Sequence, residues 1–537
     1  MIMAENKAYK VLIPAASVSS QLGELVQYTN HALIRVGKKP TLSHIIEAYA
    51  PDVPIVILIG HFGEQVRDFV KLAYPERPVT FVEVDNYDGP GSSLGYSMLQ
   101  AKDFLQCPFI YHAGDTIVED KIAEPLGNWV ACFQSSDTSD YASINVVGDR
   151  VMHIDNKGAT NYGYTHNLHI GLVGIKQYDI FWQSLESLYQ ANKLDPTLGD
   201  MAVINDMISS RQSFFKSLPV TSWFDVGHLR GIDQARQKIK DPLHILDKIN
   251  ESIFIFRDFV IKFFYDKKNI DDRVARAKIL SGLVPRVSGA VGNFYRYEFV
   301  EGDLYSRVVS PHDFLHFLEW AETNLWTKPK ETTELGGRDF KDICHDFYYT
   351  KTVERTDKLR SLAGLKDQED IINEEKIPSL GKMLEMIDFK WLCDSQPSNF
   401  HGDFILDNIL KTKHGYCLLD WRQNFGGLLA AGDKYYDLAK LNHNLTVNHD
   451  IVNQNLFSIE KRDDGHVHVD ILRKDNLVHC QETLYSFLSR GQYDIRKVRV
   501  LTALIWLNMS PLHHEPFNLF LYYFGKLHLW RNLQREN

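Results

Sequence analysis

The stretch His401-Gly402-Asp403-Phe404-Ile405-Leu406-Asp407-Asn408-Ile409-Leu410 decides how the second half of this chain is interpreted. A short apolar run follows it and ends in Asp420 and Trp421. An aspartate, an asparagine five residues later and a second aspartate at the end of a strand are the groups that phosphoryl transfer requires. Asp403 is predicted to be the catalytic base for an attacking hydroxyl. Asn408 and Asp420 are predicted to bind Mg²⁺, which prefers oxygen ligands.

These blocks resemble the aminoglycoside phosphotransferase and choline kinase family, in which HGDxxxxN precedes a strand ending in Asp-Trp. A later block, residues 432–439 (GDKYYDLA), is similar to the D-x-x-Y-D-L-A stretch of that family, and its Asp437 is expected to stabilise the catalytic loop. The resemblance covers about residues 245–530. It implies a two-lobed, protein-kinase-like α+β domain with ATP as phosphoryl donor, Mg²⁺ as cofactor, and a small alcohol, amino alcohol or sugar as acceptor.

The ATP-binding residues are predicted from the same resemblance. Lys262, in the predicted strand 259–264, either points to solvent or binds the α- and β-phosphates of ATP, and the resemblance favours the second role. The following helix carries no glutamate to hold this lysine, although Asp271 or Asp272 could substitute. Glu298 and Val300 lie in a segment that resembles the hinge between the lobes, where backbone groups meet adenine.

Two nearby groups have simpler interpretations. The basic residues that follow the predicted strand are expected to form a solvated helix face; they are Lys267, Lys268, Arg273 and Arg276. Residues 421–423, directly after the metal aspartate, either line the acceptor pocket or support the loop.

In the first half, short apolar runs alternate with amphipathic stretches. Strands are predicted at residues 9–16, 54–59, 79–84 and 108–111, with helices near 41–50, 63–72 and 92–104. This alternation predicts an α/β fold with a doubly wound, mostly parallel sheet. Ligands bind such sheets beyond the carboxyl ends of the strands, where Ser17, Gly60 and Asp115 would lie.

Several blocks in residues 8–240 resemble the sugar-1-phosphate and choline-phosphate nucleotidyltransferase family. Residues 112–115 (HAGD) resemble the end of its metal-binding strand, and residues 223–227 (WFDVG) resemble the block that carries its second metal aspartate. Residues 89–94 (GPGSSL) resemble its base- and sugar-reading loop. The resemblance implies that Asp115 and Asp225 bind metal, and that CTP or another nucleoside triphosphate is a possible substrate.

The triphosphate loop departs from this family. Ser17 and Ser19 stand at its glycine positions, Gln21 at the arginine position and His31 at the lysine position. Glycines let backbone N–H groups approach phosphate, and the basic residues neutralise its charge, so each change removes a contact or a charge. Serine hydroxyls can still donate to phosphate, and a protonated His31 could supply charge. The loop is therefore interpreted as degenerate, and nucleotidyl transfer stays open.

Bulk properties are compatible with two catalytic domains, predicted at residues 1–240 and 241–537. The 537 residues exceed one ordinary core. The net charge of −10 argues against nucleic acid as a partner, and the six scattered cysteines argue against a disulfide framework. A cytoplasmic enzyme without membrane insertion is expected. No feature indicates its oligomeric state.

Three hypotheses remain. The first is a bifunctional enzyme that phosphorylates an alcohol and joins the phosphate to a nucleotide, as for activated precursors of a bacterial surface polysaccharide. The second is a kinase with a degenerate N-terminal domain that only binds a ligand or partner. The third is an interaction scaffold, which Asp403, Asn408 and Asp420 argue against because a scaffold needs no such groups.

Overall fold

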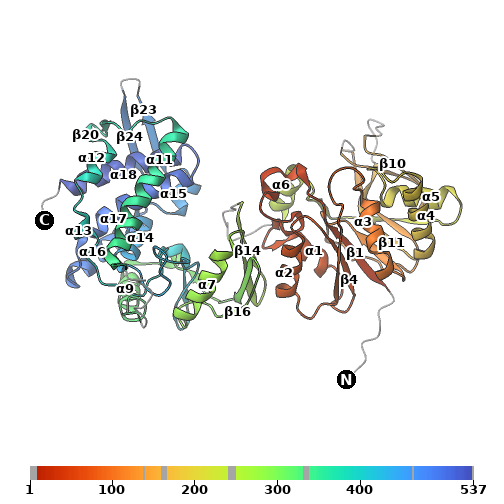
Figure 1. Cartoon of the computed structure of the whole chain (residues 1–537), viewed down its shortest axis with the longest axis horizontal. Helices are drawn as coiled ribbons and strands as arrows, with labels where there is room; N and C mark the ends of the chain where they lie inside the picture. Colours follow the sequence, from red (N-terminus) through yellow and green to blue (C-terminus); the bar gives the residue numbers. More distant parts are fainter. Residues whose placement is uncertain are drawn as a thin grey trace. The chain divides into compact units, whose positions relative to one another are not determined.

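The computed structural model describes residues 9–136, 140–158, 166–239, 249–329, 338–462 and 465–534. The chain divides into two compact units. Figure 1 colours the chain along its sequence. The N-terminal unit comprises residues 1–270 and 287–299, and the C-terminal unit comprises residues 271–286 and 300–537. The predicted domain boundary at residue 240 lies outside the described residues.

A nine-stranded sheet forms the centre of the N-terminal unit. In spatial order its strands are β5 (Val79–Glu83), β4 (Ile55–Ile59), β1 (Lys10–Ala15), β6 (Phe109–His112), β11 (His166–Ile175), β8 (Trp129–Ser135), β12 (Phe215–Val220), β10 (Arg150–Asp155) and β9 (Ser143–Val147). The four strands from β5 to β6 are parallel. They are the four strands that the alternating pattern predicts.

The prediction of a mostly parallel sheet is wrong beyond β6. There the pairs β6–β11, β11–β8, β12–β10 and β10–β9 are antiparallel, and β8–β12 is parallel. The physical reason is visible between β9 and β10, which are joined by only Gly148 and Asp149. Gly148 has a φ of 66°, and a connection this short can join only antiparallel neighbours. The first unit is therefore a mixed α/β structure.

Helices cover both faces of this sheet (Figure 1). On one face Val11 and Ile13 pack against α1 and α2, and on the other Leu12 packs against the core that includes α3, α4 and α5. Strands buried on both faces are largely apolar, and β1 is apolar at every position after Lys10. The helices are α1 (Thr41–Glu47), α2 (Gly63–Ala73), α3 (Leu94–Gln100), α4 (Tyr178–Ala191), α5 (Asp200–Ser209) and α6 (Leu229–Lys238).

Short elements complete the unit. They are the antiparallel pair β7 (Thr116–Val118) and β13 (Trp223–Asp225), the pair β2 (Arg35–Val36) and β3 (Lys39–Pro40), and the 3₁₀ helices η1 (Ser20–Val26), η2 (His31–Leu33) and η3 (Lys102–Phe104).

A second, four-stranded sheet also belongs to the N-terminal unit. Its order is β14 (Glu251–Ile255), β15 (Phe259–Phe264), β17 (Phe294–Glu298) and β16 (Val287–Val291). Phe254 and Phe294 pack on Phe69 of α2, with ring centroids 5.3 and 6.0 Å away. These aromatic side chains share one buried core with β1 and β4. The sheet is therefore held to α2 by apolar burial.

The C-terminal unit is mainly helical, as predicted for the chain beyond Pro311. Its helices are α7 (Lys267–Ile279, which begins in the N-terminal unit), α8 (Tyr305–Val308), α9 (Pro311–Asn324), α10 (Phe340–His345), the π-helix η5 (Asp346–Thr350), α11 (Lys351–Ala363), α12 (Leu380–Glu385), α13 (Phe389–Leu392), η6 (Leu406–Asn408), α14 (Lys434–Thr446), α15 (His449–Asn453), α16 (Asp475–Arg490), α17 (Ile495–Met509), η7 (Ser510–Leu512) and α18 (Phe517–Leu533). The last helices are buried on most sides, in agreement with their Leu-, Trp- and Phe-rich sequences.

Two small sheets accompany these helices. One contains β18 (Asp303–Leu304), β21 (Ile409–Thr412) and β22 (Gly415–Leu418), and its last two strands follow the loop that carries Asp403. The other, with β20 (Glu375–Ile377), β19 (Asp370–Ile372), β24 (His466–Ile471) and β23 (Phe457–Lys461), has no counterpart among the predicted elements. None of the described helices combines the length and the hydrophobicity needed to cross a bilayer.

Candidate active sites

The loop that carries Asp403 is held in place by Asp437, in the first turn of α14. One carboxylate oxygen of Asp437 accepts the backbone N–H of Gly402 at 2.7 Å, and the other accepts that of His401 at 2.7 Å and the indole N–H of Trp326 at 3.1 Å. Gly402 has a φ of 87°, and a Cβ atom there would come within 2.6 Å of Arg422. Asp437 therefore positions the loop.

Asp403 lies between a cation and an amide. Lys440 Nζ is 2.7 Å from its Oδ1, and Asn408 Nδ2 donates to its Oδ2 at 3.0 Å. Burial alone would raise the pKa of Asp403, but the Lys440 ammonium lowers it to about 2. The carboxylate is thus ionised at neutral pH. Because the Asn408 amide nitrogen faces Asp403, its Oδ1 is directed away from Asp403 and can serve another ligand.

Asp420 has a left-handed backbone, with a φ of 52°. Its Oδ1 accepts a hydrogen bond from Arg273 Nη1 at 2.7 Å, and the same nitrogen donates to the Trp421 carbonyl at 2.6 Å. The Trp421 indole donates in turn to the carbonyl of Arg273 at 2.9 Å. Arg273 thus connects α7 to Asp420, the predicted metal ligand. α7 is also the helix that carries no glutamate to hold Lys262.

The prediction of a solvated basic face on α7 is wrong for two of its four residues. Arg273 and Arg276 are 8% and 1% exposed, while Lys267 and Lys268 are exposed. Arg276 donates to the carbonyl of Phe400 at 2.6 Å, and its guanidinium lies 3.8 Å from the centre of the Phe400 ring. Carbonyl groups and an aromatic face replace water around these two guanidinium groups, which a charge pattern alone does not reveal.

The three predicted ATP-binding residues lie on different parts of the chain. Lys262 is on β15 and is only 7% exposed, so it does not point to solvent. Glu298 is the last residue of β17, the strand that pairs with β15, and Val300 follows it at the start of a segment of the C-terminal unit. The ATP-binding role of these residues stays a prediction.

In the N-terminal unit, Asp115 and Asp225 come together although 110 residues separate them. The pairing of β7 with β13 places Thr116 opposite Asp225, and Val226 N donates to the Asp115 carbonyl at 2.8 Å. A Cβ atom on Gly227 would lie 2.6 Å from Asp115 Oδ2 and 3.1 Å from Asp225 Oδ1. Both carboxylates therefore surround the same glycine, which explains a glycine at this position.

The electrostatics of this pair indicate a place for a cation. Burial and the neighbouring Asp225 carboxylate raise the pKa of Asp115. His228 Nδ1 accepts the N–H of Gly231 at 2.9 Å, so its proton is on Nε2, which lies 3.4 Å from Asp225 Oδ2 and 3.2 Å from the Tyr141 hydroxyl. A bound cation would offset the repulsion between the two carboxylates.

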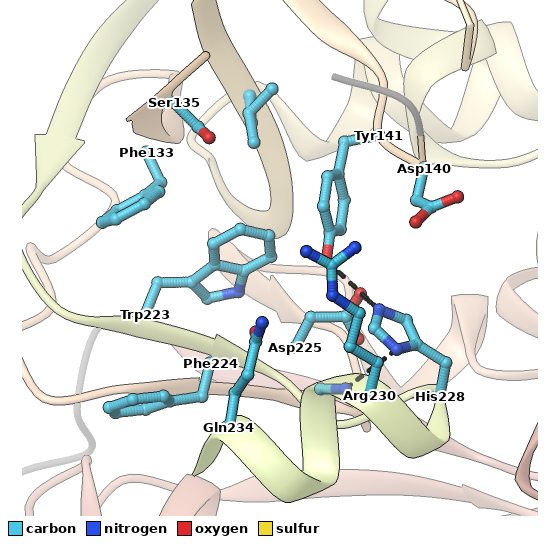
Figure 2. Close-up of a pocket in the computed structure, with 12 residues that line it drawn as sticks. Phe133, Ser135, Asp140, Tyr141, Trp223, Phe224, Asp225, His228, Arg230 and Gln234 are labelled. Carbon is cyan, nitrogen blue, oxygen red and sulfur yellow. Dashed lines mark hydrogen bonds and ion pairs between the residues drawn. The ribbon is translucent and has the colours of Figure 1, made fainter. Parts of the chain in front are cut away.

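A pocket opens beside Asp225, and Figure 2 shows its lining. Trp223 forms an aromatic wall with Tyr141 and Phe133, at centroid distances of 5.1 and 5.6 Å. The side chains of Arg230 and His228 lie on the same side as Asp225 in Figure 2. The pocket can therefore accept a ligand with an anionic end near Arg230 and an apolar or planar part against Trp223.

The predicted phosphate loop carries little charge. Ser17 and Ser19 form a hydroxyl–hydroxyl hydrogen bond of 3.0 Å, and Gln21 is exposed. Ser19 has a φ of 53°, a left-handed conformation that glycine adopts more readily. His31 is buried, with Nδ1 3.2 Å from the Ser17 carbonyl, and burial lowers its pKa to about 4. His31 is therefore neutral at pH 7 and supplies no positive charge to phosphate.

The residues present fit Mg²⁺ only as partial ligand sets. Among the described residues no group of three or more His, Cys, Asp or Glu side chains is arranged to hold a metal. Mg²⁺ sites in phosphate-transferring proteins commonly use one or two carboxylates together with substrate phosphates. Asp115 with Asp225, and Asn408 with Asp420, are sets of that kind.

Two residues at these sites were not singled out from the sequence. Lys440 lies in a segment that no motif marks as basic, and only the fold brings it to Asp403. His228 follows the WFDVG block by one residue, so its nearness to Asp225 could have been anticipated from the spacing.

Comparison with known proteins supports the N-terminal resemblance. The chain is 30% identical over 116 residues to the bifunctional protein GlmU of Methanocaldococcus jannaschii; these residues are 21% of this chain, and the match spans 27% of the length of that relative. No family model matches the chain. The N-terminal part of the chain thus resembles nucleotidyltransferases.

Several solved structures are similar to part of the chain at low identity. The CTP:phosphocholine cytidylyltransferase LicC of Streptococcus pneumoniae has 17% identity and a TM-score of 0.36, with 43% of this chain and 100% of that chain covered. A putative glucose-1-phosphate thymidylyltransferase of Bacillus anthracis has 17% identity and a TM-score of 0.37, with 45% and 98% covered. The inositol-1-phosphate CTP transferase of T. maritima has 13% identity and a TM-score of 0.34, with 44% and 98% covered.

Proposed function

We propose that the chain is a bifunctional enzyme. Its C-terminal unit transfers the γ-phosphoryl group of ATP to the hydroxyl of a small alcohol or sugar. Its N-terminal unit is a nucleotidyltransferase-like unit that acts on a phosphorylated small molecule and a nucleoside triphosphate, in a pathway such as the synthesis of activated precursors of a bacterial surface polysaccharide. The domain limits near residue 240 belong to this proposal.

The observation that carries the kinase proposal is the state of Asp403. It is an ionised carboxylate on a loop that Asp437 holds through two backbone N–H groups, with Asn408 at 3.0 Å. Phosphoryl transfer depends mainly on positioning and charge, so a fixed carboxylate beside oxygen ligands is what the reaction requires. Mg²⁺, if held by Asn408 and Asp420, would supply charge neutralisation for the phosphates.

The Asp115–Asp225 pair supports the nucleotidyltransferase proposal. The two carboxylates would hold the metal that neutralises the triphosphate, and the Trp223 pocket beside them would hold the phosphorylated substrate. His228 would orient Asp225 through its Nε2 proton.

A second candidate is a kinase whose N-terminal unit only binds a ligand. The neutral, buried His31 and the mutually bonded Ser17 and Ser19 favour it, because the loop offers no cation to a triphosphate. The two candidates differ in one observable, the release of pyrophosphate from a nucleoside triphosphate.

The kinase proposal is tested with Asp403→Asn in the full chain. Loss of the ionised base should reduce Mg²⁺-dependent ADP release in the presence of alcohols and sugars by about 10²- to 10⁴-fold, the usual contribution of a general base. Thermal unfolding of the variant should still show one folded protein.

The matched control is Asp475→Asn, because the side chain of Asp475 is 92% exposed. Its ADP release should equal that of the original chain. Equal turnover in Asp403→Asn and in the original chain would contradict the assignment of the base.

A further inference from the structure

Four basic side chains gather beside the catalytic loop: Lys440 of α14, Lys351 and Arg355 of α11, and Arg422, two residues after Asp420. We call them the basic cluster. Lys440 makes the ion pair of 2.7 Å with Asp403. The neighbouring charges of Arg422, Arg355 and Lys440 act on Lys351, which identifies the four as one group.

The cluster has a rigid support in Phe347. Lys351 Nζ lies 4.0 Å from the centre of this ring, and the guanidinium carbon of Arg422 lies 5.1 Å from it. Phe347 is buried against Phe425 and Tyr436, with centroid distances of 4.3 and 5.0 Å. It belongs to the π-helical turn that immediately precedes Lys351, and such turns recur at functional sites.

Arg422 is also fixed to the catalytic loop. Its backbone N–H donates to the His401 carbonyl at 3.0 Å, and its side chain covers the position where Gly402 would carry a Cβ atom. Its Nε donates to the Asn424 carbonyl at 3.0 Å. The sequence left open whether residues 421–423 line the acceptor pocket or support the loop, and these contacts place Arg422 against the loop.

The charge of the cluster is not balanced. In the part of the chain that the structure describes, Lys351, Arg355 and Arg422 form no ion pair with an Asp or Glu, and Asp403 balances Lys440 alone. Arg355 Nη1 donates to the Asn508 carbonyl at 3.0 Å, a neutral partner. Burial and the neighbouring cations lower the pKa of Lys351 well below its ordinary value. An anion bound here would favour the charged form of Lys351 and raise its pKa again.

We propose that the acceptor of the C-terminal unit is a hydroxyl compound that already carries an anionic group, above all a phosphate ester, which the basic cluster binds. This inference rests on the kinase function proposed above and names the acceptor class of the same site. A cationic amino alcohol such as choline would be repelled by the Arg355 and Arg422 guanidinium groups, whereas a phosphate dianion can accept from several groups of the cluster.

The reaction then has a simple balance. The acceptor oxygen attacks the γ-phosphorus of ATP, the new O–P bond forms, and the bond from the γ-phosphorus to the bridging oxygen breaks. ADP leaves with that oxygen, and the hydroxyl proton passes to Asp403. The basic cluster takes no part in bond making; it holds the anionic end while the hydroxyl faces the base.

The phosphates of ATP are the other source of the same chemistry. Arg355 of α11 donates to the Asn508 carbonyl of α17, and among the described contacts neither Lys351 nor Arg355 touches the predicted metal ligands Asn408 and Asp420. This placement favours the acceptor, and not ATP, as the ligand of the basic cluster. The KM values for the acceptor and for ATP distinguish the two.

The test uses the full chain, MgATP and matched acceptors: glycerol with glycerol 3-phosphate, glucose with glucose 6-phosphate, and choline. ADP release should be at least tenfold higher in kcat/KM with a phosphorylated member than with its neutral partner. Lys351→Gln should raise the KM of that acceptor about tenfold or more and leave the KM of ATP within about threefold. Lys351→Arg should retain the acceptor KM.

Lys358→Gln is the matched control, because Lys358 is an exposed residue of the same helix. Its kinetic constants should equal those of the original chain. Preference for a neutral acceptor or for choline, with Asp403→Asn inactive, would overturn the anionic acceptor while leaving the kinase intact. A rise in the KM of ATP alone in Lys351→Gln would also overturn it, and would assign the cluster to the nucleotide.

A binding measurement covers acceptors outside this panel. Titration of inorganic phosphate into the full chain should give a saturable heat of binding. The affinity for phosphate should fall at least fivefold in Lys351→Gln and be unchanged in Lys358→Gln. Equal phosphate binding in both variants would overturn the inference. If the kinase proposal itself is wrong, a different result is expected: the original chain will not bind MgATP.

Discussion

At the scale of single residues, buried histidines determine how each unit responds to acid. His31 and His112 in the N-terminal unit and His401 in the C-terminal unit each have their pKa lowered to about 4 by burial. His401 shows the cause: Asp403 N donates to its Nδ1 at 3.2 Å, and its Nε2 lies 2.8 Å from the Leu419 carbonyl. Neutral imidazole satisfies both contacts, and the charged form does not.

This predicts a loss of stability on acidification. Between pH 6.5 and 4 the unfolded chain binds more protons at these histidines than the folded chain does, so the free energy of unfolding falls as the pH falls. The expected slope is about 1.4 kcal/mol per pH unit for each histidine. Denaturant unfolding at pH 7.0 and 5.5 measures it.

A matched pair of variants assigns the slope. In His112→Gln, the difference in bound protons between the unfolded and the folded chain should be smaller by about one proton. His153→Gln, at an exposed side chain, should behave as the original chain. Identical slopes in His112→Gln and the original chain would show that His112 titrates normally.

At the scale of elements, the sheet β14–β17 depends on α2. Phe69 contacts Phe254 and Phe294, and all three are buried in one core with β1 and β4. The four-stranded sheet therefore stands on the N-terminal unit, although the sequence resemblance assigns its strands to the kinase-like half.

Phe69→Ala should destabilise the chain by about 3–5 kcal/mol, because it leaves a cavity under the small sheet. Hydrogen exchange should show lower amide protection in β15 and β17 together with α2. Phe104→Ala, at a side chain that is 44% exposed, is the control and should leave protection unchanged. Loss of protection in α2 with β15 and β17 unaffected would mean that the sheet is stable without α2.

At the scale of the whole molecule, the predicted metal-binding and base residues of the two proposed active sites belong to different units. Asp115, Asp225 and the Trp223 pocket belong to the N-terminal unit, whereas Asp403 and Asp420 belong to the C-terminal unit. Two activities with separate residues should be separable by single substitutions.

Asp225→Asn should abolish pyrophosphate release from nucleoside triphosphates in the presence of phosphorylated alcohols or sugars, and should leave ADP release by the kinase unchanged. Its Mg²⁺ or Mn²⁺ affinity should fall, measured by titration. In the original chain this affinity should continue to rise between pH 5 and 7, above the usual range of about 4 for aspartate, because the pKa of Asp115 is raised.

Asp233→Asn, at an exposed residue of α6, is the control. If the original chain releases no pyrophosphate with any nucleoside triphosphate, the second candidate, a ligand-binding N-terminal unit, replaces the bifunctional enzyme.

Much of this protein is determined by local sequence. The alternation of apolar strands and amphipathic helices predicts β1, β4, β5 and β6 and their parallel pairing, because side-chain periodicity reports directly which faces are buried. Short motifs also identified Asp115, Asp225, Asp403, Asn408 and Asp420 as candidate groups. Each lies within a few residues of a recognisable strand or turn.

Tertiary structure alone decided the rest. The antiparallel half of the large sheet and the sheet β20-β19-β24-β23 depend on pairings between distant strands, which periodicity does not specify. Lys440 at Asp403, Arg273 at Asp420 and the unbalanced charges of Lys351, Arg355 and Arg422 are likewise long-range contacts. The physical reason is that charge and burial depend on what surrounds a side chain in space, and neighbours in sequence supply only part of those surroundings.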